Sequence, residues 1–158
     1  MISNSDGRMS EERWALLIAS EFGDADPLYD QAMERLCEAI EEYGYHVTRT
    51  FTFREGLALI EDSPSFSVIL LGWDLLRDNY LDDGVALEVI RVARRRNSSL
   101  PIVLIFGRTL IAEVSNEVLK QVNGHIFLFV DTPMSAANLV HFSVTGYRYD
   151  PADLFPDN

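Results

Sequence analysis

The sequence has one cysteine, one lysine and no long apolar run, and each shortage excludes a class of protein. Cys37 cannot form a disulfide within the chain, which indicates a reducing compartment such as the cytoplasm. The longest apolar runs contain a handful of residues, whereas a membrane-spanning helix needs about 20. The first of these runs, at 14–19, is also too short for the core of a secretion signal. We therefore expect a cytoplasmic protein that does not enter a membrane.

Positive charge is also scarce, because 13 Lys and Arg residues stand against 25 Asp and Glu residues, which gives a formal net charge of −12. A surface this acidic repels the phosphates of nucleic acids and the headgroups of anionic lipids, so neither is an expected partner. With 158 residues, 47% of them hydrophobic, the chain can bury the core of one domain. Composition predicts a folded acidic domain and leaves its function open.

What the sequence does contain is an alternation of short apolar or β-branched runs with amphipathic segments. We predict strands at 14–19, 45–51, 66–71, 101–106 and 126–130. We predict helices at 32–43, after a loop that contains Pro27, then at 52–61, from a cap at 82 or 83 to 96, at 110–122 and at 132–147. Five strands, each followed by a helix, predict an α/β fold. The expected form is a flavodoxin- or CheY-like doubly wound parallel five-stranded sheet, with strand order 2-1-3-4-5 and 45–51 at one edge.

Polar residues at the ends of the predicted helices support these boundaries. Thr52 and Glu55 have the spacing of a capping box, in which two side chains satisfy the free amides of a helix start. Thr132 and Pro133 fit the N-cap and the first position of the last helix. The pair 123–124, Asn-Gly, is expected to close the helix that precedes it.

In a sheet of this kind the chemistry lies at the carboxyl ends of the strands. A receiver domain that accepts a phosphoryl group needs an acidic pair after the first strand and an aspartate at the end of the third. It also needs a hydroxyl after the fourth strand and a lysine after the fifth. This chain has one carboxylate, Glu21, then Gly72 with Asp74 two residues late, then Phe106, and no lysine in 129–131. We therefore do not expect phosphorylation by the receiver mechanism, since one carboxylate cannot hold Mg²⁺ and no nucleophile is in register.

Cofactor chemistry is equally unsupported by the sequence. The loop 21–26 is acidic and would repel the phosphate of a flavin. Neither GxGxxG nor GxxxxGK[ST] occurs, so nucleotide binding of either familiar kind has no motif. Lys120, the sole lysine, is predicted on a helix away from the strand ends and is a poor candidate for Schiff-base chemistry. We predict no cofactor-binding residue in this chain.

The remaining reactive side chains each have a simpler structural interpretation. Cys37 lies on the apolar face of its predicted helix and is expected to be a small core residue. Three arginines at 94–96 fit a solvated helix C-terminus better than an anion site. The histidines lack metal-ligand spacing and are expected at the surface or in hydrogen bonds: His46, His125 and His141. One acidic cluster fits a solvated loop better than a cation site: Asp78, Asp82 and Asp83. We predict no catalytic and no metal-binding residue.

Several short segments resemble the amino-terminal region of the inducible, pyridoxal-phosphate-dependent arginine, lysine and ornithine decarboxylases. The segments 16–22, 32–40 and 52–60 look like the biodegradative arginine decarboxylase branch in particular. The segments 100–107 and 127–132 are similar to the family's fourth and fifth strands. In that family a receiver-like "wing" domain precedes a linker and the domain that binds the cofactor.

The C-terminal residues 147–148 and 154–156 resemble the family's exit into this linker, which usually has two prolines where this chain has Pro-Asp at 156–157. We therefore expect a disordered segment at 1–13, a receiver-like wing domain at 14–149, and at 150–158 the start of a linker to a catalytic region that is missing here. The resemblance implies that pyridoxal phosphate and its Ser-x-His-Lys lysine belong to the parent enzyme beyond Asn158. It gives no catalytic residue in this chain.

The resemblance also implies a structural function, because wing domains of this family join dimers into decamers at acid pH. We expect this domain to contact neighbouring wing domains in such a homo-oligomer, in an enzyme of acid stress. Charge gives a physical reason: −12 opposes association at neutral pH, and protonation near about pH 5 reduces that repulsion. The alternative is a stand-alone atypical response-regulator receiver domain that lacks the phosphoacceptor aspartate, and a small flavodoxin-like enzyme is a third possibility.

Overall fold

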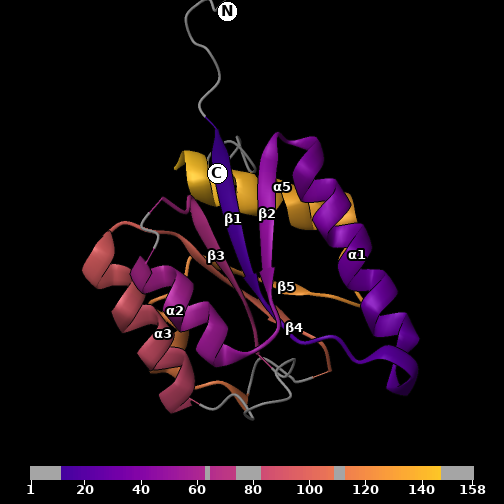
Figure 1. The fold of residues 1–158 in the computed structure, drawn as a ribbon, viewed down its shortest axis with the longest axis horizontal. Helices are drawn as coiled ribbons and strands as arrows, with labels where there is room; N and C mark the ends of the chain where they lie inside the picture. The colour runs from indigo at the N-terminus through magenta and orange to yellow at the C-terminus, as the bar shows by residue number, and fades with distance from the viewer. Residues whose placement is uncertain (1–11, 63–64, 74–82, 109–112, 147–158) are drawn as a thin grey trace, which may run out of the picture.

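The computed structural model describes residues 12–62, 65–73, 83–108 and 113–146, which contain one sheet of five parallel strands (Figure 1). The strands are β1 (Arg13–Ile18), β2 (Tyr45–Thr50), β3 (Val68–Gly72), β4 (Ile102–Phe106) and β5 (Gly124–Phe127). Their order across the sheet is β2-β1-β3-β4-β5. This confirms the predicted fold class and strand order, including the edge position of β2.

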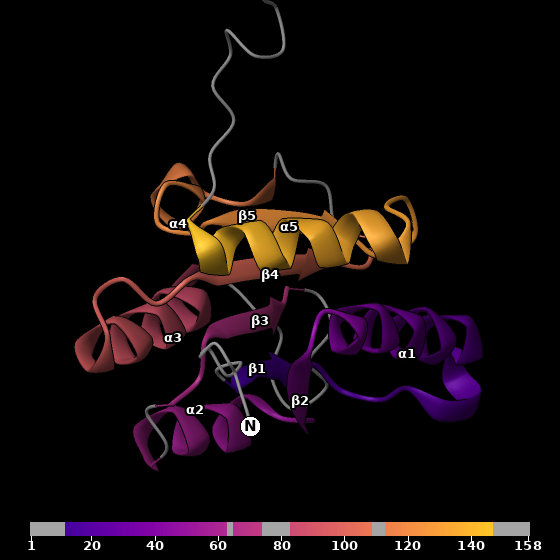
Figure 2. The same ribbon diagram turned by 90° about the horizontal axis from the view of Figure 1, so that it is seen from above.

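Helices cover both faces of the sheet (Figure 2). One face carries α1 (Pro27–Glu42), which follows the short 3₁₀ helix η2 (Gly23–Ala25), and α5 (Pro133–Thr145). The other face carries α2 (Phe53–Asp62), α3 (Asp83–Arg96) and α4 (Asn116–Leu119). None of the helices in the described ranges is long and apolar enough to cross a membrane.

The central strands are buried on both faces, which is why they appear in the sequence as continuous apolar runs. Every residue of β3 and of β4 is buried. Successive residues of β1 point to opposite faces, so that Leu17 packs toward α1 and α5 whereas Leu16 and Ile18 pack toward α2 and α3. The sheet therefore separates two apolar layers, each closed by its own helices.

The predicted cap at Thr52 is formed at the start of α2, and Glu55 reaches back to the residue before the cap and not to the N–H of Thr52 itself. Thr52 Oγ1 accepts a hydrogen bond from the Glu55 N–H at 3.1 Å, and the Glu55 carboxylate accepts one from the Phe51 N–H at 3.0 Å. At the start of α5, Thr132 Oγ1 accepts from the Ser135 N–H at 3.1 Å. Both predicted helix starts are confirmed.

The first helix begins earlier than predicted. α1 begins at Pro27, where the sequence analysis expects a loop, and the Asp26 carboxylate caps it by accepting from the Tyr29 N–H at 3.2 Å. The expectation of a loop at Pro27 is wrong because proline disrupts only a helix interior. At the first position its missing N–H has no partner to lose.

The fourth helix is shorter than the predicted segment 110–122, of which 110–112 lies outside the described residues. α4 starts after Ser115, whose hydroxyl accepts from the Val118 N–H at 3.3 Å, and it ends at Leu119. Asn123 does not close this helix. Its side-chain oxygen accepts from the Ile102 N–H at 2.9 Å and so binds the start of β4. The helical spacing of apolar residues here reflects burial against the core, not one long helix.

The fifth strand begins and ends earlier than the predicted 126–130. The Phe127 carbonyl accepts from the N–H groups of Val130 at 3.0 Å and Asp131 at 2.8 Å. The Asp131 carboxylate in turn accepts from the Phe127 N–H at 2.8 Å. The Leu128 N–H still donates to the Phe106 carbonyl of β4 at 2.9 Å, and the turn then takes 129–130 out of the sheet although both residues are apolar.

Candidate functional site

The carboxyl edge of the sheet carries no nucleophile at the ends of β3 and β4, where a receiver domain has its acceptor and its hydroxyl. Gly72 ends β3, one residue after the predicted end of that strand, and the fully buried Phe106 ends β4 as predicted. Trp73 follows Gly72, is 5% exposed, and has its ring centroid 6.1 Å from that of Phe106. A packed pair of aromatic rings therefore lies at these two strand ends, where a receiver domain has polar side chains.

The charged groups that phosphoryl transfer would require are not assembled in the described ranges. Glu21 is exposed in the loop after β1, and Asp74 lies outside the described residues. The fifth strand ends at Phe127 and not at 129–131, and Lys120 lies exposed just after α4. Among the described residues, no group of three or more His, Cys, Asp or Glu side chains could hold a metal ion.

The acidic loop 21–26 has its amides occupied by a carboxylate of the same chain. The two oxygens of Asp30 accept hydrogen bonds from the Phe22 N–H at 3.0 Å and the Gly23 N–H at 2.7 Å. Backbone N–H groups of such a loop are the donors that a phosphate cradle offers to its ligand. The amides of Phe22 and Gly23 are therefore already bonded within the chain, and the expectation that the loop is no flavin-phosphate site stays a prediction.

Arg108 connects the loop after β4 to the loop before α1, a contact that the sequence analysis does not foresee. Its guanidinium lies 2.9 Å from the Asp26 carboxylate and 4.7 Å from the centre of the Phe129 ring. The Arg108 side chain is nevertheless 64% exposed. The one signal in the sequence is a basic residue two positions after a strand of an acidic chain.

Four exposed apolar side chains lie at the helix starts and in the turn at this edge of the sheet, and we call them the apolar corner. It consists of Leu28 in the first turn of α1, Phe129 and Val130 in the turn after β5, and Met134 in the first turn of α5. Helices α1 and α5 pack against each other and both begin at the carboxyl edge of the sheet (Figure 2). The ring of Tyr29 lies 6.1 Å from that of Phe129. No local pattern in the sequence predicts this set of exposed residues.

The structure places His141 in a packed and hydrogen-bonded position on α5. Its Nδ1 lies 3.0 Å from the Tyr45 hydroxyl, and its ring stacks on Tyr43 with centroids 4.8 Å apart. Burial, with a smaller effect from the Arg13 charge, lowers the pKa of His141 below its ordinary value. The prediction of a hydrogen-bonded histidine is confirmed here.

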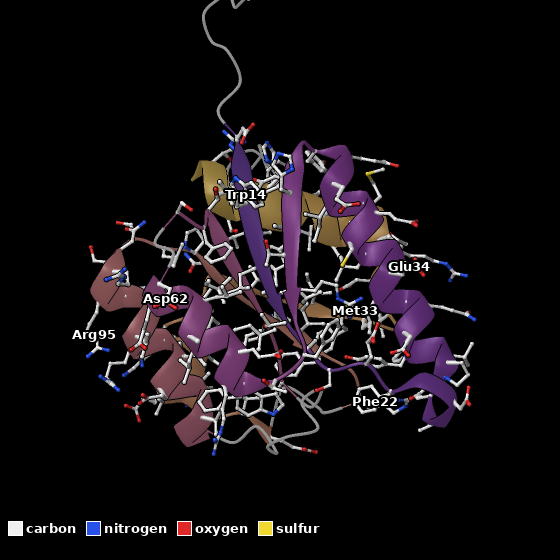
Figure 3. All side chains as sticks on the ribbon, in the orientation of Figure 1. Trp14, Phe22, Met33, Glu34, Asp62 and Arg95 are labelled. Atoms are coloured by element: carbon white, nitrogen blue, oxygen red, sulfur yellow. The ribbon has the colours of Figure 1, made fainter. Side chains whose placement is uncertain are left out.

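The other two histidines lie elsewhere. His46 is exposed and stacks on Trp14 at 4.5 Å, at the opposite end of the sheet from Phe22 (Figure 3). His125 is exposed on β5, with its ring 5.2 Å from that of Phe127. The three imidazoles are not brought together as ligands of one site.

The lowered pKa of His141 predicts that acid destabilises the fold through this residue. The unfolded chain takes up the proton below about pH 6.5, before the folded chain does, so stability is present above that pH and is lost as the pH falls. We expect urea unfolding to show a smaller decrease between about pH 7.5 and 5.5 in His141→Gln than in the native chain. The exposed His46→Gln serves as the control and should keep the native slope. Equal slopes in all three proteins would contradict this assignment.

The sequence predicts the environment of Cys37 correctly, but it predicts that of the three arginines at 94–96 only in part. Cys37 is buried on α1, and burial raises its pKa to about 11, which confirms an unreactive core residue. Arg95 and Arg96 are exposed, as predicted. The prediction is wrong for Arg94, which is half-buried and bonded within the chain.

Arg94 is half-buried and binds three oxygen acceptors. It donates to the Leu100 carbonyl at 3.0 Å, the Gln121 carbonyl at 2.9 Å and the Asn123 side chain at 3.1 Å. Arg94 therefore joins the end of α3 to the segments that flank β4 and β5, because acceptors from distant parts of the chain converge on it.

The acidic cluster of Asp78, Asp82 and Asp83 cannot be placed. The first two lie outside the described residues, and only the backbone of Asp83, at the start of α3, is described. The interpretation of this cluster as a solvated loop stays a prediction.

Comparison with known proteins identifies relatives of this fold. The family model described as "Orn/Lys/Arg decarboxylase, N-terminal domain" matches residues 28–147. The biodegradative arginine decarboxylase of Escherichia coli (strain K12) is 21% identical over 134 residues, which are 84% of this chain and 18% of that enzyme.

Solved structures agree with the sequence comparison. Lysine decarboxylase A from Pseudomonas aeruginosa superposes with a TM-score of 0.71 and 22% identity, over 87% of this chain and 19% of that one. A CheY-like response regulator receiver domain from Methanospirillum hungatei JF-1 gives a TM-score of 0.64 at 17% identity, over 86% of this chain and 96% of that domain. The structural likenesses show a shared fold, and the chain spans about a fifth of the length of the two decarboxylases.

Proposed function

The chain belongs to the Orn/Lys/Arg decarboxylase N-terminal domain family, and on this premise we propose that it is a non-catalytic wing domain that helps to assemble a longer amino-acid decarboxylase. The observation that carries the proposal is the pair of strand ends at Gly72 and Phe106, where a glycine and a buried aromatic ring stand in place of phosphotransfer groups. The relatives support a decarboxylase activity for the longer parent protein. This chain matches about a fifth of the length of each of two named decarboxylases.

The residues of this chain do not fit the pyridoxal phosphate that the family implies. Lys120 is the sole lysine, and it is exposed to solvent directly after a four-residue helix, away from the carboxyl ends of the strands. The loop after β1 offers a phosphate no free amides at Phe22 and Gly23, because Asp30 occupies both. In this proposal the cofactor and the reacting lysine belong to the rest of the parent polypeptide.

Charge supports an assembly function that depends on acidity. The chain carries −12 at neutral pH, so packing several copies together is electrostatically costly. Carboxylates close to one another begin to take up protons near about pH 5, which reduces this cost. We propose that the domain serves contacts between dimers of a cytoplasmic enzyme used under acid stress.

Sedimentation velocity of the polypeptide that carries this domain tests the proposal. We expect a larger assembly at about pH 5 than at about pH 7.5, because the repulsion between acidic domains falls as carboxylates are protonated. The matched control is the same polypeptide without residues 1–146, which should lose this dependence on pH. Identical mass at both pH values in the intact polypeptide would contradict the assembly function.

The alternative, a stand-alone atypical receiver domain, has the same fold. The receiver structures are consistent with it and do not favour it, because low identity at this TM-score speaks only to the fold. Acetyl phosphate with Mg²⁺ distinguishes the two: a labile acyl phosphate on Glu21 or Asp74 would support the receiver and oppose the wing domain.

A further inference from the structure

We infer that a polar groove at the amino end of the sheet binds a free amino acid by its carboxylate and its ammonium group together. This amino-end groove is formed by the segments that lead into β1, β3, β4 and β5 and by the end of α5. The choice of arginine, lysine or ornithine as the ligand rests on the proposed function, whereas the groove and its chemistry rest on the geometry. Its polar lining includes Glu12, Arg13, Asn97, Ser99, Asn123 and Thr145.

The amino-end groove has the size of a site for a small metabolite. Its volume is about 500 Å³, within the range of about 300–1,000 Å³ that ligand pockets occupy. Most of its lining side chains are charged, amide or hydroxyl groups, and the apolar ones are Phe66, Pro101 and Val144. The groove lies at the end of the sheet where Trp14 lies, away from the carboxyl ends of the strands (Figure 3). A polar ligand fits this lining better than an aromatic or aliphatic one.

Two asparagines supply hydrogen-bond donors to the groove. The Asn97 side-chain oxygen accepts from the Ser99 N–H at 3.0 Å, and that of Asn123 accepts from the Ile102 N–H at 2.9 Å. These bonds identify the oxygen of each amide, so the Nδ2 group is the end left for a ligand. Neither Nδ2 group forms a hydrogen bond within the described parts of the chain.

Positive charge lies close to these donors. Arg94 donates to the Asn123 side-chain oxygen at 3.1 Å, so its charge polarises that amide and strengthens the Nδ2 group as a donor. Arg13 lines the groove and adds a second guanidinium. Hydrogen bonds between a guanidinium and a carboxylate are among the stronger ones in proteins. The groove therefore carries the donors that a single carboxylate needs.

The groove also carries negative charge, which suits an ammonium group. Helix α5 ends in the groove at Thr145, and the carbonyl groups at a helix C-terminus carry a partial negative charge. Glu12 adds a full negative charge to the lining. These groups and the net charge of −12 oppose a phosphate or a dicarboxylate, whereas Arg13 opposes a diamine. A zwitterion such as an amino acid satisfies both sets of groups.

Isothermal titration calorimetry of the 158-residue chain at neutral pH, with L-arginine, L-lysine and L-ornithine, tests the inference. We expect at least one of them to bind with a Kd of about 1 mM or tighter, a realistic affinity for a polar ligand of this size. The amine that lacks the carboxylate of that amino acid, and its Nα-acetyl derivative, should each bind at least about tenfold more weakly, because each loses charge-assisted hydrogen bonds. Absence of binding by all three amino acids overturns the inference. Equal binding of the amine or of the acetyl derivative also overturns it.

A substitution at Asn97 tests whether the ligand lies in this groove. Asn97→Asp keeps an oxygen for the Ser99 N–H but replaces the Nδ2 donor by an atom that repels a carboxylate, so affinity should fall by about tenfold or more. Asn116→Asp, at the exposed start of α4, makes the same change of charge and should bind like the native chain. Circular dichroism checks that both variants are folded.

Native affinity in Asn97→Asp would overturn the inference, because the amino acid would then bind elsewhere. Such a result leaves the proposed function intact, since the pH dependence of sedimentation of the longer polypeptide decides that function separately.

Discussion

Replacing Arg94 with methionine is expected to lower the free energy of unfolding by about 2–3 kcal/mol, because hydrogen bonds to a charged group contribute about 1.5–3 kcal/mol each and are costly to leave unmade. Arg94→Met keeps much of the side-chain volume but removes every donor to the Leu100 and Gln121 carbonyls. Both acceptors lie where the chain enters β4 and β5. Urea denaturation at neutral pH measures the loss.

The neighbouring Arg96→Met is the matched control, because Arg96 is exposed in the same last turn of α3. Substitutions at such a surface position change stability by about 0.5 kcal/mol or less. If Arg94→Met cost no more than Arg96→Met, the role of Arg94 would be the generic one of a cation at a helix C-terminus.

A methyl group at Gly56 is expected to destabilise the domain by about 1–3 kcal/mol, the usual cost of overpacking a core. A Cβ built on Gly56 would lie 2.5 Å from Ile18 Cδ1 and 2.8 Å from Ile18 Cγ1. Ile18 is fully buried at the end of β1, so it has little room to move. This clash should outweigh the roughly 1 kcal/mol by which alanine favours a helix over glycine.

A double-mutant cycle with Ile18→Val tests the cause of that effect. Ile18→Val removes the Cδ1 atom, so Gly56→Ala should cost less in that background than in the native chain. The exposed Ala58→Ser on the same helix is the control and should change stability by about 0.5 kcal/mol or less. Additive effects of Gly56→Ala and Ile18→Val would show that α2 and β1 are not in the proposed contact.

The fold is predictable from the sequence because burial leaves a direct trace in residue type. β3 and β4 are covered on both faces, so their residues form continuous apolar runs that differ from the spaced pattern of α1 and α2. Apolar residue type predicts the wrong strand end where a buried residue lies outside the assigned strand. The buried Leu128 extends the apolar run of β5 one residue past the end of the strand at Phe127, although its N–H still bonds the Phe106 carbonyl at the end of β4.

Only some residues of the candidate site are predictable from the sequence, because strand ends follow from local patterns whereas contacts between distant residues do not. Gly72 and Phe106 are assigned from the sequence because strand ends can be counted along the chain. Arg94 and Arg108 cannot be assigned in this way. Arg94 binds Gln121, 27 residues away, and Arg108 binds Asp26, 82 residues away, and no local pattern reports which acceptors will converge on a cation. The apolar corner escapes prediction likewise, because it combines residues from both ends of the chain.

The carboxylate of Asp30 on the amides of Phe22 and Gly23 has a consequence for how such domains can change function. A tethered anion competes at an effective concentration that a dissolved metabolite rarely reaches. The loop is thus self-inhibited toward anions, and gaining a ligand there would require the loss of Asp30 before any new binding residue could help. Loss of the Asp30 carboxylate would therefore be the first evolutionary step toward a loop that senses an anionic ligand.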